Sequence, residues 1–192
     1  MREIGSIVRL QIQRSSLKTG EKANKVYDPA PLLAVPRLAL TAEGALGLAP
    51  DGSWVVDVHH RAHPATKNAD GEHGISVGFT AHYAAMRDRF GGRITTGCAG
   101  ENILAQTDRR LTYDDLKDGL TILDPAGREL VRLRVLQVAH PCRPFTGWAL
   151  GRRVEPETLK EHLQFLDDGM RGYYCVAEGA GIVSLGDRVV VR

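Results

Sequence analysis

A cysteine and an arginine stand side by side in the segment 140–144, with a proline on each side of the pair. A strand-like apolar run, residues 130–139, ends directly before this segment, and a helix-like run begins near Glu155. Prolines fix φ and remove backbone donors, so the segment is stiff. Because a nearby cation favours an ionised thiol, Cys142 beside Arg143 is a candidate thiolate. The alternative is a buried, inert cysteine in a turn.

The number and spacing of the cysteines limit the kinds of cysteine-based site that we expect. The chain has three cysteines, Cys98, Cys142 and Cys175, and this odd, widely spaced set favours reduced thiols of a cytoplasmic protein over a disulfide framework. There is no Cys-x-x-Cys pair to support a zinc ribbon, and a cysteine-ligated iron–sulfur cluster normally needs four thiols. Cys175 lies in a strand-like run and is predicted to be a small core residue.

Three histidines, His59, His60 and His63, follow a strand-like run at residues 53–58. His59 and His63 have the i, i+4 spacing that places two zinc ligands on one helix face. The preceding strand and the following proline argue against a helix, so we expect a polar loop whose histidines bind a ligand or face water. His82, in contrast, lies on the apolar face of a predicted helix and is expected to be packed.

Two polar loops could contact a ligand. The segment 95–102, Thr-Thr-Gly-Cys-Ala-Gly-Glu-Asn, combines hydroxyl donors with glycines that allow a close backbone approach. The segment 14–25 carries three lysines, among them Lys18. It is either a solvated loop or a basic lip that meets an anionic ligand.

Composition limits the class of protein. The chain has 192 residues, 43% of them hydrophobic, and a net charge of +2, which fits one globular domain over residues 1–192. This charge gives no reason to expect a nucleic-acid or membrane partner. No apolar run approaches the ~20 residues of a membrane helix, and the N-terminus does not resemble a signal peptide. We therefore expect a cytoplasmic protein.

The predicted elements are mostly short strands. Residues 4–12 alternate, with Ile4, Ser6, Val8, Leu10 and Ile12 expected on one face and Gln11 and Gln13 on the other. About nine strands and two or three helices follow from such patterns, one strand every ten or so residues. This spacing predicts a mainly β fold with peripheral helices, closed or nearly closed into a barrel.

Three stretches in order resemble MOSC domains, the kind found at the C-terminus of molybdenum-cofactor sulfurases and as standalone bacterial proteins. They are Gly100-Glu101-Asn102, then Pro141-Cys142-Arg143, then residues 171–174 together with 186–189. The strand at residues 5–8 and the His59-His60 segment fit the same pattern. The chain departs from it at Ala99, where an aromatic residue is usual, and at residues 65–74, which look inserted.

This resemblance implies a β-barrel that binds the molybdenum cofactor (molybdopterin), a pterin dithiolene with a terminal phosphate. The residue matching Cys142 is a molybdenum ligand in the reductase branch and is suspected of carrying sulfur in the sulfurase branch. The implied cofactor-binding residues are Lys18, His60, Arg61, Thr95, Thr96, Gly100, Glu101, Asn102 and Arg143. At the level of the family, the resemblance also carries an association with pyridoxal phosphate binding.

Three functional hypotheses follow. The first is an oxidoreductase that reduces N-hydroxylated small molecules, with electrons from an external electron-transfer protein because the chain has no cysteines for its own cluster and no nicotinamide-binding fingerprint. The second is a sulfur carrier with a persulfide on Cys142, or a cofactor-binding chaperone without its own turnover. The third is a barrel that has lost the metal.

Overall fold

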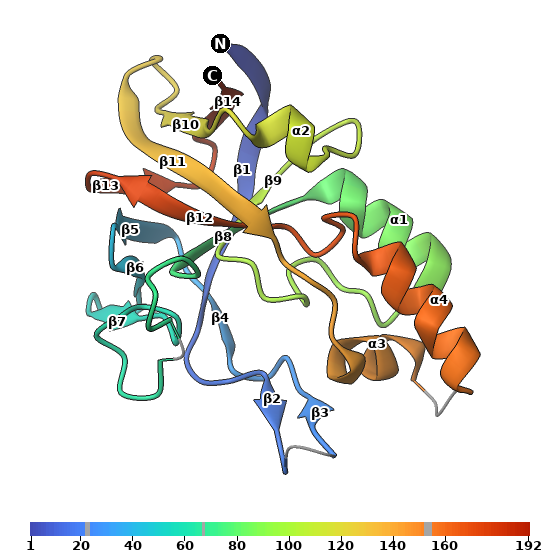
Figure 1. Cartoon of the computed structure of the whole chain (residues 1–192). Coiled ribbons are helices and arrows are strands. Elements are labelled where there is room, and N and C mark those ends of the chain that lie inside the picture. Colours follow the sequence, from blue (N-terminus) through green and yellow to red (C-terminus); the bar gives the residue numbers. More distant parts are fainter. Residues whose placement is uncertain (22–23, 67, 152–154) are drawn as a thin grey trace.

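Seven strands close into a barrel in the computed structural model of the chain, which describes residues 1–21, 24–66, 68–151 and 155–192 (Figure 1). Their order is β14-β10-β11-β12-β8-β9-β1, and β14 also pairs with β1 to complete the ring. Only β8 and β9 are parallel, and helix α1 connects them. The bounds are β1 Arg2–Gln13, β8 Ile75–Phe79, β9 Ile103–Ala105, β10 Leu120–Leu123, β11 Glu129–Val138, β12 Tyr173–Glu178 and β14 Arg188–Val191.

Alternating side chains explain how these strands enclose a core. Along β11, Val131, Leu133 and Val135 are buried while Arg132 and Arg134 are exposed. This period of two turns one face of each strand into the barrel. The predicted mainly β fold with a closed barrel and peripheral helices is therefore confirmed.

A second sheet packs beside the barrel. Its order is β13-β5-β6-β7, with bounds β13 Gly181–Ser184, β5 Arg37–Thr41, β6 Gly44–Leu48 and β7 Trp54–Val56. A short strand, β4 (Leu32–Ala34), extends the end of β1, and a small hairpin is formed by β2 (Lys18–Thr19) and β3 (Val26–Tyr27). Figure 1 shows this hairpin projecting from the barrel near α3.

Of the four helices in the described part of the chain, three gather on one side of the barrel, as Figure 1 shows. They are α1 (Thr80–Phe90), α3 (Arg143–Leu150) and α4 (Pro156–Leu166), and α2 (Tyr113–Leu116) lies nearer the chain ends. A second apolar cluster fills the space beneath them and includes Tyr83, Met86 and Phe145. Within the described ranges, no helix is both long enough and apolar enough to cross a membrane.

The expected alternation along β1 is wrong in part. Val8 is 41% exposed, whereas Ile7 and Gln11 are 1% exposed. An irregularity in the pairing with β9, between Ile7 and Arg9, shifts the register. The bulge changes the alternation locally, so that Ile7 rather than Val8 is in the core, while Leu10 and Ile12 lie in the core as expected. Gln11 and Gln13, expected on the solvent side, are buried because the loop at residues 97–100 covers them and accepts their hydrogen bonds.

Helix α3 was not expected. The sequence predicted a helix beginning near Glu155, which is the N-cap of α4, but α3 already begins at Arg143. Pro144 is tolerated there because the first helical turn has no intrahelical partners for its N–H groups. The segment that looked like a stiff turn is therefore the start of a helix, and Cys142 is its N-cap residue.

Candidate active site

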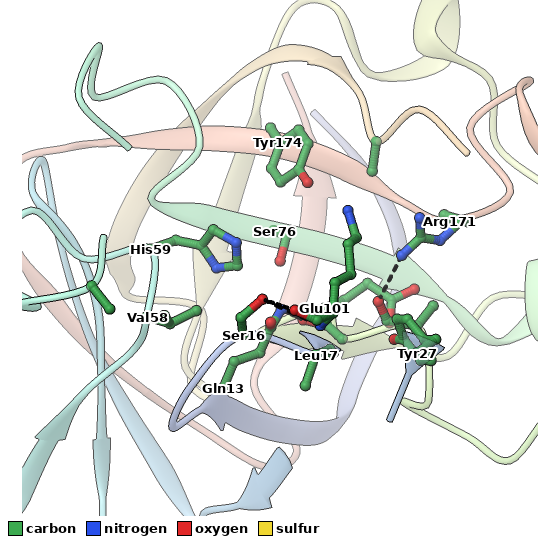
Figure 2. Close-up of a pocket in the computed structure, with 15 residues that line it drawn as sticks. Gln13, Ser16, Leu17, Tyr27, Val58, His59, Ser76, Glu101, Arg171 and Tyr174 are labelled. Carbon is green, nitrogen blue, oxygen red and sulfur yellow. Dashed lines mark hydrogen bonds between the residues drawn. The ribbon is translucent and has the colours of Figure 1, made fainter. Parts of the chain in front are cut away.

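A pocket with a volume of about 130 Å³ lies at one end of the barrel (Figure 2). Residues before β12, at the end of β1 and after β11 line it, together with the loops after β7 and before β9. The lining is polar on several sides and includes Gln13, Lys18, His59, Ser76, Glu101, Arg171 and Tyr174. The barrel thus brings together groups from distant parts of the chain.

Arg171 links the loops around this pocket. Its Nη2 donates to the carbonyl of Ala99 at 3.1 Å, and its Nη1 lies 3.5 Å from the carbonyl of His140. The same Nη1 lies 3.5 Å from the Sγ of Cys142, and the guanidinium stacks 4.4 Å above the ring of Phe145. Burial acts to lower the pKa of Arg171, but the facing acidic groups, Cys142 foremost, raise it overall.

Cys142 stands where two sources of positive potential meet. It is half-buried at the N-cap of α3, where the helix dipole and unpaired N–H groups favour an anion. Arg171 supplies a charged donor to the sulfur. Arg143, which the sequence placed beside the thiol as its cation, is exposed, so the charged contact comes from Arg171 instead. A thiol in such surroundings is suited to act as a nucleophile or a metal ligand.

Glu101 is a buried carboxyl at the floor of the pocket. It is 3% exposed, and Tyr83 donates a hydrogen bond to its Oε2 at 2.6 Å. Its Oε1 has no partner among the described residues. Burial raises the pKa of Glu101. Glycines leave room for the carboxylate, since a Cβ on Gly78 would lie 2.7 Å from Oε1.

The loop that carries Glu101 is held by the buried glutamines of β1. Gln11 Nε2 donates to the carbonyl of Gly97 at 2.7 Å, and Gln13 Nε2 donates to that of Gly100 at 2.8 Å. Gly100 has a φ of +98°, and a Cβ there would lie 2.8 Å from Gln13 Nε2. Here the glycines accommodate the barrel's own side chains, because a larger residue would displace them.

Asn102 is part of a buried network behind the pocket. Its Oδ1 accepts from the backbone N–H of Ser76 at 2.9 Å, and its Nδ2 donates to Asp57 Oδ2 at 3.0 Å. Asn102 therefore ties β8 to the loop after β7 and acts as a structural support for residues that face the pocket.

The two remaining cysteines are buried thiols. Burial raises the pKa of Cys98 to about 12, with the Glu101 carboxyl adding to the effect. Burial also raises the pKa of Cys175 to about 12, and this residue lies in the core within β12, as expected. All three cysteines are free. Cys142, the least buried, is the one placed for chemistry.

The predicted site residues separate into two groups. Lys18, Gly100 and Glu101 line the pocket. Cys142 contacts Arg171, which lines the pocket, and Asn102 lies in the hydrogen-bond network behind it. The others are not among its described lining residues: Arg61, Thr95, Thr96 and Arg143 are exposed elsewhere, and His60 is buried against β6, where a Cβ on Gly44 would lie 2.8 Å from its Cα.

The histidine segment forms turns. His60 N–H bonds to the carbonyl of Asp57, and His63 N–H bonds to the carbonyl of His60. Residues 57–66, all of which the structure describes, contain turns and bends but no helix, so His59 and His63 do not share a helix face. His59 lines the pocket, whereas His63 is not among the described lining residues.

Sequence reasoning missed Arg171, Tyr174 and Asp57 as contributors to this site. Arg171 and Tyr174 were part of a matched motif, yet no spacing along the chain indicated that Arg171 contacts a thiol on another segment. The segment that looked inserted also contributes, since Ala65 lines the pocket and the ring of His73 packs 4.7 Å from that of Tyr174.

Comparisons with solved structures agree with this fold. Among solved structures, the chain is similar to the YuaD protein from Bacillus subtilis, at 16% identity and a TM-score of 0.53, with 97% of each chain covered. It is also similar to YiiM from Geobacillus stearothermophilus, at 17% identity and a TM-score of 0.53, covering 99% of this chain and 74% of that one. These likenesses support the fold. A search of curated proteins finds no match.

The family model described as "MOSC domain" matches residues 59–190. This range contains the Gly-Glu-Asn loop, the Cys142 segment and the turn with Arg171 before β12, and so covers most of the pocket. MOSC domains are generally associated with the molybdenum cofactor. On this match, the chain belongs to the MOSC domain family.

Proposed function

We propose that the protein binds the molybdenum cofactor, with Cys142 as a protein ligand to molybdenum, and reduces N-hydroxylated small molecules. The observation that carries this proposal is the contact between the half-buried Cys142 thiol and Arg171, whose guanidinium also lines the pocket. An accessible, cation-supported thiol next to a polar cavity is what a soft metal ligand requires.

The chemistry of the pocket fits this cofactor. A pterin presents both donors and acceptors along its edges, and the pocket offers both kinds of group without internal partners. Glu101 Oε1 and Arg171 Nε are buried and have no hydrogen-bond partner among the described residues. Buried polar groups normally find partners, so these two atoms are suited to a bound polar ligand. Lys18, at the rim, is suited to the terminal phosphate.

Each residue then has a defined task. Cys142 ligates the metal, Arg171 stabilises the thiolate and holds the two loops together, and Glu101 with Gln13 contacts the pterin. When bound, the cofactor supplies two-electron reduction of the N–O bond. Several of these groups are buried at the barrel end, and burial strengthens their electrostatic contacts with a bound ligand.

The electrons come from outside the chain. Three free cysteines, two of them buried in core clusters, do not provide the four thiols that an iron–sulfur cluster normally needs. We therefore propose an external electron-transfer protein as the partner.

Anaerobic turnover tests the proposal. Protein made in a host that synthesises the cofactor is mixed with a reduced viologen dye and an amidoxime, and oxidation of the dye is followed. We expect reduction by the wild type and loss of at least about 10²-fold for Cys142→Ala, because the metal ligand is removed. The matched control Cys98→Ala changes a buried cysteine. Equal rates for wild type and Cys142→Ala would contradict the proposal.

A second candidate is sulfur transfer. The observation in its favour is that Cys142 is half-exposed at the start of α3, outside the group of described residues that line the pocket. An accessible thiolate can hold a persulfide and pass the sulfur on. Intact-protein mass spectrometry separates the two: a reducible single-sulfur adduct that disappears in Cys142→Ala, without turnover of amidoxime, favours the carrier.

A further inference from the structure

The buried carboxylate of Asp57 holds His59, the one histidine among the described residues that line the pocket. Asp57 is 0% exposed. Its Oδ1 accepts from the backbone N–H of His59 at 2.8 Å and lies 3.0 Å from His59 Nδ1. Its Oδ2 accepts from the backbone N–H of Gln13 at 2.6 Å and from Asn102 Nδ2 at 3.0 Å. This carboxylate is therefore fixed by its own turn and by two other segments of the chain.

The contact with Asp57 defines the state of the His59 ring. A carboxylate only accepts hydrogen bonds, so contact with an ionised Asp57 favours the tautomer with the proton on Nδ1. Nε2 is then left to exchange a proton with another group. The His59 side chain is 28% exposed, and the ring lies at the pocket (Figure 2). Catalytic histidines are held in this way: one ring nitrogen is bonded to a carboxylate, and the other exchanges a proton with the reacting group.

His59 and Arg171 face the cavity from different sides. Figure 2 shows the His59 ring at one side of the pocket and Arg171 at the other, with Ser76 and Glu101 between them. A substrate held beside the cofactor, at the side of the pocket where His59 lies, is next to that ring. The terminal nitrogens of Arg171 contact Cys142 and Ala99. His59 contacts Asp57 through Nδ1, which leaves its Nε2 for the substrate.

We infer that His59 is the catalytic acid that protonates the leaving oxygen of an N-hydroxylated substrate, and that Asp57 positions its ring. The inference rests on the proposed function and adds a residue to it. The sequence named His59 only as one of three loop histidines expected to bind a ligand or face water, and it gave Asp57 no role.

The reaction explains why an acid is needed. Reduction of R–NH–OH consumes two electrons and two protons and yields R–NH₂ and water. The N–O bond breaks, the electron pair supplied by the external electron-transfer protein goes to the fragments, and one proton must reach each of them. Hydroxide is a poor leaving group, so protonation of the oxygen as the bond breaks lowers the barrier. The protonated His59 ring gives that proton from Nε2 and keeps the proton on Nδ1. Solvent then reprotonates Nε2 and supplies the second proton, which the nitrogen fragment takes up.

Other charged and titratable groups face the same cavity, and their surroundings suit them less well. Glu101 is 3% exposed and is bonded to Tyr83. Burial raises the pKa of Tyr174, and Lys18 and Arg171 are cations on the rim and wall. Histidine is the side chain that ordinarily exchanges protons between pH 5 and 8. Its position and its carboxylate partner single out His59.

The test uses His59→Gln with His63→Gln as a matched control from the same loop. Full-length protein is made with the cofactor, and molybdenum, kcat and the pH dependence of kcat are measured. We expect unchanged molybdenum in both variants, a fall in kcat of about 10²-fold or more for His59→Gln alone, and loss of the limb of the pH profile that depends on an acid. A His59→Gln protein that keeps wild-type kcat, or that loses molybdenum, overturns the inference.

A second readout does not require turnover. In ¹⁵N-histidine-labelled protein without cofactor, at a pH where the rings are neutral, NMR identifies the nitrogen that carries the proton. We expect His59, assigned by its absence in His59→Gln, to be protonated at Nδ1, which reports the contact with Asp57. Protonation at Nε2 overturns the positioning role. If wild type shows the Nδ1 proton but holds no molybdenum, the proposed function fails and the inferred acid fails with it, while the Asp57–His59 pairing stands.

Discussion

Arg171 Nη1 lies 3.5 Å from Cys142 Sγ, although the two residues are separated by 29 positions in the chain. The thiol is at the N-cap of α3, and the arginine precedes β12. The contact places a charged donor on a half-buried sulfur and, through the carbonyls of Ala99 and His140, ties that sulfur to both loops of the pocket. The chemistry proposed for Cys142 depends on this contact.

Replacement of Arg171 by glutamine is expected to slow alkylation of Cys142. Hydrogen bonds to charged groups contribute roughly 1.5–3 kcal/mol, so loss of the cation should reduce the rate constant with iodoacetamide at pH 7 by about tenfold or more. Arg143→Gln removes an equal charge from an exposed position next to the cysteine and should change the rate by less than about twofold. Mass spectrometry of the alkylated peptide gives both rates. A larger effect from Arg143→Gln than from Arg171→Gln would show that Arg143, and not Arg171, supplies the charge that supports the Cys142 sulfur.

His82 is expected to make the protein sensitive to acid. Burial lowers the pKa of His82 from 6.5 to about 4, while its Nε2 accepts from the N–H of Leu111 at 3.0 Å. The unfolded state therefore binds the proton first as the pH falls, and the free energy of unfolding decreases between pH 6.5 and 4. From this residue the loss should be about 3 kcal/mol between pH 7 and pH 4.

Urea unfolding at pH 7 and pH 4 measures the effect of His82. In His82→Gln the difference between the two pH values should shrink by about 3 kcal/mol, because the titrating group is gone. His63→Gln, outside the apolar clusters, serves as the control and should behave as the wild type does. An unchanged pH dependence in His82→Gln would show that this histidine is not the acid-sensitive group.

Glu101 should have the opposite pH dependence. Burial raises the pKa of its carboxyl, so the folded state holds the proton more tightly than the unfolded state does. Stability then falls as the pH rises from the ordinary value of 4.5 through the raised value. We expect Glu101→Gln to gain stability relative to wild type as the pH increases from 5 to 8, measured by urea unfolding of the cofactor-free protein. A difference that does not vary with pH would mean that Glu101 is already charged in the fold.

The barrel was predictable because closure of the sheet pairs the backbone groups that short alternating strands would otherwise leave exposed at the sheet edges. Alternation identified β11, and the turn at residues 124–127 identified its hairpin with β10. The face of β1 was predictable only in part, since a bulge between Ile7 and Arg9 turns Ile7 rather than Val8 toward the core. The burial of Gln11 and Gln13 was not predictable, because it depends on a loop from a distant part of the chain. Helix α3 was missed because Pro144, which stops a helix from within, is compatible with a first turn.

The site was predictable in its thiol and its Gly-Glu-Asn loop, and much less so in their partners. Adjacency along the chain pointed to Arg143, whereas the fold brings Arg171 to the sulfur. The sequence pointed to His60, but it is the neighbouring His59 that lines the pocket. Which of these two histidines points inward depends on the turn that begins at Asp57, and this turn could not be predicted from the sequence. Contacts of this kind are set by the tertiary structure.

Metal and pterin analysis of the purified protein tests the central proposal most directly. Wild type, Cys142→Ala and Cys98→Ala are produced in a host that makes the molybdenum cofactor, and molybdenum is measured by mass spectrometry beside pterin fluorescence. The account predicts near-equal molar molybdenum and pterin in wild type and Cys98→Ala, with molybdenum reduced by about tenfold or more in Cys142→Ala, because a ligand is lost. Absence of molybdenum from the wild type, or full retention in Cys142→Ala, would contradict it.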